Sequence, residues 1–73
     1  MDSATAEVAI KALIHEVRAL VDEAAGISKA AEACIEAGTA NNAIEIALGL
    51  EQPLYEASRL LDAAALMNRL YRT

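Results

Sequence analysis

The chain has 73 residues, a formal net charge of -5 and 56% apolar residues, of which only Tyr55 and Tyr71 are aromatic. A chain this short forms one domain, residues 1–73, and buries only about 60% of the surface that its unfolded form exposes. The single cysteine, Cys34, excludes an internal disulfide, and Cys34 with His15 supply too few ligands for a structural zinc ion. The small size therefore indicates helix packing or association as the source of stability.

Charge and hydropathy disfavour two further classes of function, nucleic-acid binding and insertion into a membrane. The acidic balance disfavours nucleic-acid binding, because phosphate backbones would repel the chain. No apolar run approaches the roughly 20 residues of a membrane-spanning helix, and the N-terminus has no basic segment followed by an apolar stretch. We therefore expect a cytoplasmic protein that does not enter a membrane.

The composition indicates an all-α fold. Eighteen residues are alanine, whereas glycine, proline, valine and threonine are sparse. Alanine has the highest helix propensity and loses almost no side-chain entropy in a helix. We expect helices throughout the chain.

The first predicted helix covers about residues 3 to 37, with Asp2 or Ser3 as its N-cap. Its apolar residues recur at alternating steps of four and three, the spacing of a helix that packs against another helix. Ile14 and Val21 widen this stripe on one side. The stripe contains Ala6, Ile10, Leu13, Val17, Leu20, Ala24, Ile27, Ala31 and Cys34.

Gly26 gives a conflicting signal within this segment. A glycine can end a helix in a left-handed C-cap, yet the four-and-three spacing continues beyond Gly26 without a change of phase. Glycine inside a helix costs about 1 kcal/mol relative to alanine, which a packed bundle tolerates. We interpret Gly26 as a kink.

The densest cluster of turn-forming residues lies at residues 38–42, Gly-Thr-Ala-Asn-Asn, so we place a bend there. Asn42 followed by Glu45 resembles a capping box that would start the second arm, at about residues 42 to 72. Pro53 interrupts this arm, because it cannot donate a hydrogen bond to the carbonyl of Gly49. The arm either kinks there or starts a new helix with Pro53 in its first turn.

Beyond Pro53 the apolar face is broad. Leu54, Ala57, Leu61 and Ala64 form one stripe, and Leu60, Ala64, Met67 and Tyr71 form an adjacent one.

Two architectures fit this pattern. We favour a kinked antiparallel helical hairpin that bends at residues 38–42 and completes a helical bundle by oligomerisation. The alternative is a three-helix bundle with turns near Gly26 and near residues 49–52. Alanine along the stripes permits close packing but buries little apolar area, so we expect a homo-oligomer to supply the area that one chain lacks.

The sequence contains no pattern typical of an enzyme or of a cofactor site. His15 has no second histidine four residues away, and Cys34 lies in the apolar stripe, as expected for a small buried residue. The acidic residues are dispersed along the helices, and the glycines are too far apart for a phosphate-binding loop.

The candidate binding residues lie in the last helix, where both tyrosines occur with three arginines and an asparagine. Arginine and tyrosine are enriched in protein interfaces, and together they can also hold a phosphate and stack on a base. The residues are Tyr55, Arg59, Asn68, Arg69, Tyr71 and Arg72.

We therefore carry two hypotheses. The first is a small acidic homo-oligomer that acts as a protein–protein interaction module, in the manner of small adaptors, chaperones and inhibitors. The second is an oligomer that binds a small anionic ligand such as a nucleotide in Arg/Tyr-lined pockets between subunits. Phage-encoded sequestering proteins are of this general size and helicity. That second comparison is one of scale and carries no shared motif.

Overall fold

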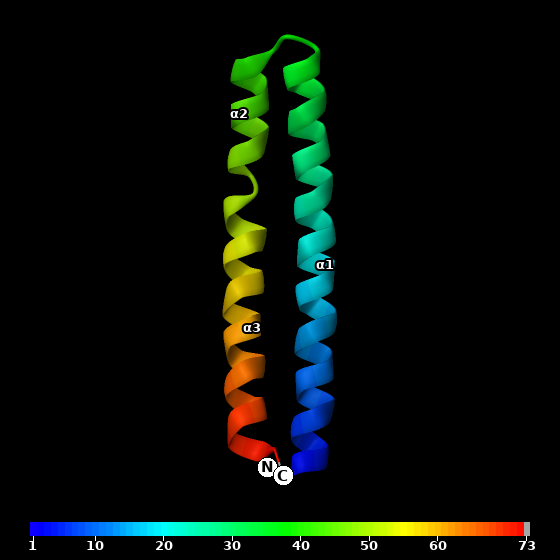
Figure 1. The fold of residues 1–73 in the computed structure, drawn as a ribbon, viewed down its shortest axis with the longest axis vertical. Coiled ribbons are helices and arrows are strands. Elements are labelled where there is room, and N and C mark those ends of the chain that lie inside the picture. Colours follow the sequence, from blue (N-terminus) through cyan, green and yellow to red (C-terminus); the bar gives the residue numbers. More distant parts are fainter. Residues whose placement is uncertain (73) are drawn as a thin grey trace.

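The computed structural model describes residues 1–72, which form an antiparallel hairpin of two helical arms (Figure 1). Helix α1 (Ser3–Glu36) is one arm, and helices α2 (Ala40–Leu48) and α3 (Glu51–Tyr71) together form the other. All regular structure in residues 1–72 is helical. The Cα atoms span 54 Å along the arms and only 13 by 12 Å across, so the hairpin is long and narrow.

Asp2 caps the start of α1, as the sequence predicts. Its carboxylate accepts a hydrogen bond of 2.8 Å from the backbone N–H of Thr5. Hydrogen bonding from the backbone and side chain of Thr5 lowers the pKa of Asp2, because it favours the charged form. A lowered folded-state pKa means that this contribution is present above the pKa of the unfolded chain and is lost as the pH falls through the folded-state value.

The bend at residues 37–39 is a Schellman motif built around Gly38. Gly38 has φ +83°, and its N–H donates to the carbonyl of Ile35 while the N–H of Thr39 donates to that of Cys34. The hydroxyl of Thr39 also donates to the Cys34 carbonyl. These bonds satisfy the last carbonyls of α1 and turn the chain back on itself.

The predicted bend is therefore confirmed, but the predicted capping box is not. Helix α2 begins at Ala40, with Thr39 as its N-cap, and Asn42 already lies inside the helix. Gly38 and Thr39 alone reverse the chain, because the Schellman bonds leave no need for a longer loop.

Gly26 lies inside α1, which continues through it without a break. The arrangement with a turn at Gly26 does not form, and the chain adopts the hairpin. A methyl group at Gly26 would meet no atom within 4 Å, so the glycine is not required by close packing.

The second arm is interrupted only briefly between α2 and α3. Gly49 and Leu50 both keep right-handed helical dihedral angles, and their N–H groups donate to the carbonyls of Ile46 and Ala47. Helix α3 restarts at Glu51 with Pro53 in its first turn, where its missing N–H leaves no intrahelical bond unmade. Because the backbone stays helical, α2 and α3 continue in nearly the same direction (Figure 1).

Two inner stripes meet along the seam between the arms. In α1 the buried and half-buried residues are those of the predicted stripe, with the addition of Ala9. In the second arm they follow the same alternating steps of three and four, and the phase is kept through the interruption. The inner residues of that arm are Ala43, Ile46, Leu50, Pro53, Ala57, Leu60, Ala64, Met67 and Tyr71, with Ala47 beside them.

Contacts near the two ends fix the register of the seam. Ala6 and Tyr71 line one cleft, and the Cβ position of Gly49 lies 4.0 Å from the side chain of Ile27. Because the arms are antiparallel, moving one residue toward the C-terminus in α1 corresponds to moving one residue toward the N-terminus in the second arm. Counting from Ala6 and Tyr71 therefore places Leu20 opposite Ala57. In this register, layers in which a large residue faces an alanine alternate with layers of two large residues. The first kind comprises Leu13–Ala64, Leu20–Ala57, Tyr71–Ala6 and Ile46–Ala31, and the second Ile10–Met67, Val17–Leu60 and Ile27–Leu50.

The core of this hairpin is small. Five of the seven buried residues of the described chain are alanines, and the other two are Leu20 and Pro53. Ala6, Ala24, Ala57 and Ala64, which the sequence assigns to the seam, are buried as predicted. The hairpin alone thus buries little apolar area.

Gly26 of α1 and Gly38 of the bend differ in backbone conformation, and stability measurements can test this difference. Replacing Gly26 by alanine should stabilise the protein by about 1 kcal/mol, because an exposed helical glycine gains helix propensity without a clash. The matched change Gly38→Ala should destabilise it by about 1 kcal/mol or more, because alanine disfavours a positive φ.

Thermal unfolding at one fixed protein concentration measures both changes. A Gly26→Ala variant that melts at a lower temperature than the parent would contradict the continuous path of α1.

Candidate functional site

One side of the hairpin carries an unpartnered apolar face. Ile14 and Val21 of α1 and Leu54 and Leu61 of α3 each remain 46–52% exposed. Ile35 extends the same stripe toward the bend and is 54% exposed. We call these five residues the apolar face.

Helix geometry places these residues on one side. Ile14 and Val21 each follow an inner leucine by one residue, and so does Leu61, whereas Leu54 follows Pro53. Successive helical residues are rotated by about 100°, so each lies beside the seam. Two antiparallel right-handed helices are related by a two-fold rotation about an axis perpendicular to the plane that contains both. The residue that follows an inner residue therefore lies on the same side of the hairpin in both arms.

The opposite side carries glutamates. Glu16, Glu23 and Glu56 occupy the equivalent positions there, one residue before an inner residue. The carboxylate of Glu56 accepts a hydrogen bond of 2.8 Å from the side-chain amide of Gln52. Leu70, which is 60% exposed, and Ala63 occupy equivalent positions on this side of α3. The two sides thus differ in that glutamates interrupt the apolar residues on this one, whereas Ile14, Val21, Leu54 and Leu61 follow one another on the apolar face.

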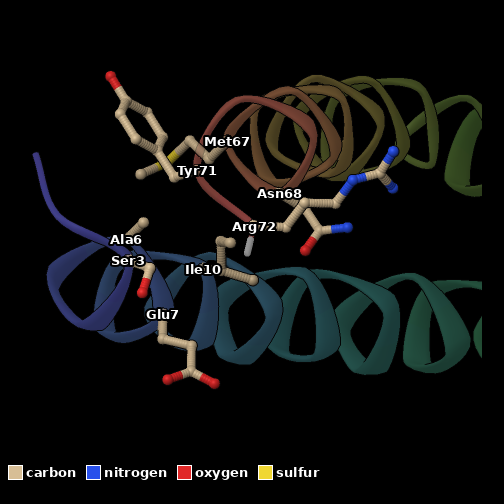
Figure 2. Close-up of a pocket in the computed structure, with 8 residues that line it drawn as sticks. All are labelled: Ser3, Ala6, Glu7, Ile10, Met67, Asn68, Tyr71 and Arg72. Atoms are coloured by element: carbon tan, nitrogen blue, oxygen red, sulfur yellow. The ribbon is translucent and has the colours of Figure 1, made fainter.

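A cleft of about 250 Å³ lies at the open end of the hairpin, where the two chain ends approach each other (Figure 2). Ala6, Ile10 and Met67 form its apolar part, and Glu7 and Asn68 belong to the stripes that contain Ile14 and Leu61. The cleft is therefore continuous with the apolar face. Its lining residues are Ser3, Ala6, Glu7, Ile10, Met67, Asn68, Tyr71 and Arg72.

The structure gathers three of the six predicted binding residues at this cleft. Asn68, Tyr71 and Arg72 line it together, and Tyr71 is half-buried in the seam. Figure 2 shows these side chains projecting from the end of α3 around the first turns of α1. Glu7 also lines the cleft, but Figure 2 shows its carboxylate directed away from the side chain of Arg72.

The other three predicted residues lie elsewhere. Arg59 pairs with Asp62 at 3.4 Å, and both side chains are exposed. Tyr55 and Arg69 share the outer side of α3 but are separated by about 21 Å along its axis. The six residues therefore do not form one pocket within a single hairpin.

Charge is divided unequally along the hairpin. The open half, residues 1–20 and 57–72, holds five lysines and arginines and four acidic residues, a formal charge of +1. The half near the bend, residues 21–56, holds one lysine and seven acidic residues, a formal charge of -6. Folding brings the two cation-containing segments together, and this makes the molecule electrically polar along its length.

The ion pairs of residues 1–72 are local. Arg18 and Asp22 approach to 3.7 Å, as their spacing predicts, and both are exposed, so this pair contributes little to stability. Lys11 and Glu7 have the same i, i+4 spacing but form no ion pair within the described residues.

Two further classes of site find no support in residues 1–72. No group of three or more histidine, cysteine or acidic residues is arranged to hold a metal ion. No described helix has the length and hydropathy needed to cross a membrane.

The apolar face was not predicted as a binding surface from the sequence, although four of its residues were assigned to apolar stripes. Ile14 and Val21 were expected to widen the inner stripe, and Leu54 and Leu61 to form one of two stripes on the last helix. The structure puts Leu60 and Met67 inward and leaves Leu54 exposed. A third apolar position in each seven-residue repeat is typical of helices in larger bundles, and this is the signal that could have identified the face.

The two tyrosines offer a test of structural against binding roles. Tyr71→Ala should destabilise the protein by about 1 kcal/mol, because its half-buried ring closes the seam opposite Ala6. Tyr55→Ala should leave stability nearly unchanged, since Tyr55 is exposed. Chemical denaturation of both variants measures the difference, and equal effects would contradict the register of the seam.

We compared the chain with protein-family models, curated proteins and solved structures, and found no match in any of the three.

Proposed function

We propose that this protein is a small helical interaction module that acts by packing its apolar face against another helical surface, and that it works as a homo-oligomer. The observation that supports this most directly is the exposed stripe of Ile14, Val21, Leu54 and Leu61 along one side of the seam. Apolar residues at three positions of each seven-residue repeat are typical of helices inside a bundle, whereas a two-helix seam needs only two.

The exposed area of the hairpin supports the same proposal. Its accessible surface is 5323 Å², whereas a compact monomer of 7.7 kDa exposes about 4,300 Å². The excess of about 1,000 Å² resembles the roughly 800 Å² that each partner buries in a stable protein interface. A partner on the apolar face would therefore supply the burial that a thin, alanine-rich hairpin lacks.

Binding of a small anionic ligand has less support. Only Asn68, Tyr71 and Arg72 of the six predicted residues share a cleft, and Arg59 is paired with Asp62 elsewhere on α3. The cleft therefore offers a phosphate a single arginine, and the net charge of -5 disfavours the approach of an anion.

Self-association is the direct test of this proposal. Sedimentation and thermal unfolding should both depend on protein concentration in the micromolar range, because association stabilises the folded hairpin by mass action. Val21→Glu should shift the protein toward monomer and lower its melting temperature, since a carboxylate would be buried without a partner.

Val8→Glu is the matched control. Val8 is 71% exposed and lies on the outer side of α1, so the same change should leave association intact. A parent protein that remains monomeric at all concentrations, with an unchanging melting temperature, would overturn the proposal independently of either variant.

A further inference from the structure

We infer that the occupant of the apolar face is a second copy of this chain, packed antiparallel about a two-fold axis through the level of Val21 and Leu54. This inference rests on the proposed function and adds the partner, its direction and its register. The result is a four-helix bundle in which the bend of each hairpin lies beside the open end of the other.

The spacing of the face supplies the register. Along α1 its stripe contains residues 7, 14, 21, 28 and 35, and Val21 is the central one. Along the second arm the corresponding residues are 68, 61, 54, 47 and 40, with Leu54 in the centre. A two-fold axis at this central level superimposes every layer of one copy on a layer of the other.

The layers are complementary in size. The layer of Ile14 and Leu61 meets the layer of Ser28 and Ala47 of the second copy, so large side chains oppose small ones. The same axis places Ile35 of the second copy at the level of Glu7 and Asn68, beside the cleft at the open end. Large residues facing small ones also characterise the seam within the hairpin, and this pattern allows close packing of helices.

The charges favour the antiparallel direction. It places the open half of each copy, with formal charge +1, beside the bend half of the other, with formal charge -6. A parallel dimer would place the two acidic halves together. Like charges brought within a Debye length, about 8 Å at physiological ionic strength, repel one another.

One pair of residues makes the complementarity specific. The axis at Val21 places Lys11 within one residue, about 1.5 Å, of the level of Glu32 of the second copy, and two-fold symmetry repeats the contact. Both residues are exposed and border the apolar face, and neither takes part in an ion pair within the described hairpin. Each copy thus presents a cation where the other presents a carboxylate.

Thiol cross-linking tests the direction of packing. In a Cys34→Ala background, Val21→Cys alone should form a covalent dimer with a short thiol-reactive cross-linker, because a residue on the two-fold axis meets its own copy. A mixture of Ile14→Cys and Ser28→Cys proteins should cross-link to each other more than either does alone. His15→Cys, on the outer side of α1, is the control that should stay monomeric.

The possible results separate this inference from the proposed function. Cross-linking of Val21→Cys only with Leu54→Cys, and not with itself, would show a parallel dimer and overturn the inference while leaving self-association intact. A dimer in sedimentation that none of these cysteines cross-links would show another face in use, and would also overturn it. A monomer at all concentrations would overturn both proposals.

A charge exchange tests the register. Lys11→Glu should weaken dimerisation about tenfold, because it sets carboxylates against each other at two symmetric contacts. Adding Glu32→Lys should restore the dissociation constant to within about threefold of the parent value, since the pair is re-formed with its charges exchanged.

Lys29→Glu makes the same charge change on the outer side of α1 and should not weaken the dimer. Sedimentation at low ionic strength measures the three variants. A double variant no tighter than Lys11→Glu alone would overturn the pairing of residues 11 and 32.

Discussion

The packing of large side chains against alanines along one seam is the constraint on which the rest of the structure depends. Leu20 lies opposite Ala57 and Tyr71 opposite Ala6, so two long arms can approach closely along 54 Å. The same alanines limit the apolar area that the seam removes from water. The alanine pattern thus allows the two arms to pack closely and also leaves the core with little buried apolar area. A partner on the exposed apolar face would bury more.

The glycine and proline residues lie where they do not interrupt the packing between the two arms. Gly38 takes the one positive φ of the described chain and reverses its direction. Pro53 stands in the first turn of α3, where its missing N–H costs no hydrogen bond, and Gly49 and Leu50 remain helical. The second arm therefore keeps the phase of its inner stripe, and the apolar side of α3 stays aligned with that of α1.

Function, in this proposal, follows from the asymmetry of the hairpin. Its two sides differ in hydropathy, and its two ends differ in charge. The first difference selects the face that meets a partner, and the second selects the direction of a second copy. Apolar contact would supply most of the affinity, while the charges would supply specificity, as is common in protein interfaces.

The sequence by itself determined the helices, the inner stripe of α1 and the bend, because these depend on local propensity and on spacing along one helix. It favoured the hairpin over a three-helix bundle but left both open. It did not determine which of two adjacent stripes on α3 turns inward, since Leu54 and Leu60 are equally apolar. Only the register of the seam decided that Leu60 faces α1 and Leu54 faces outward. The apolar face and the charged ends likewise join residues from both arms, so they exist only once the chain has folded back on itself.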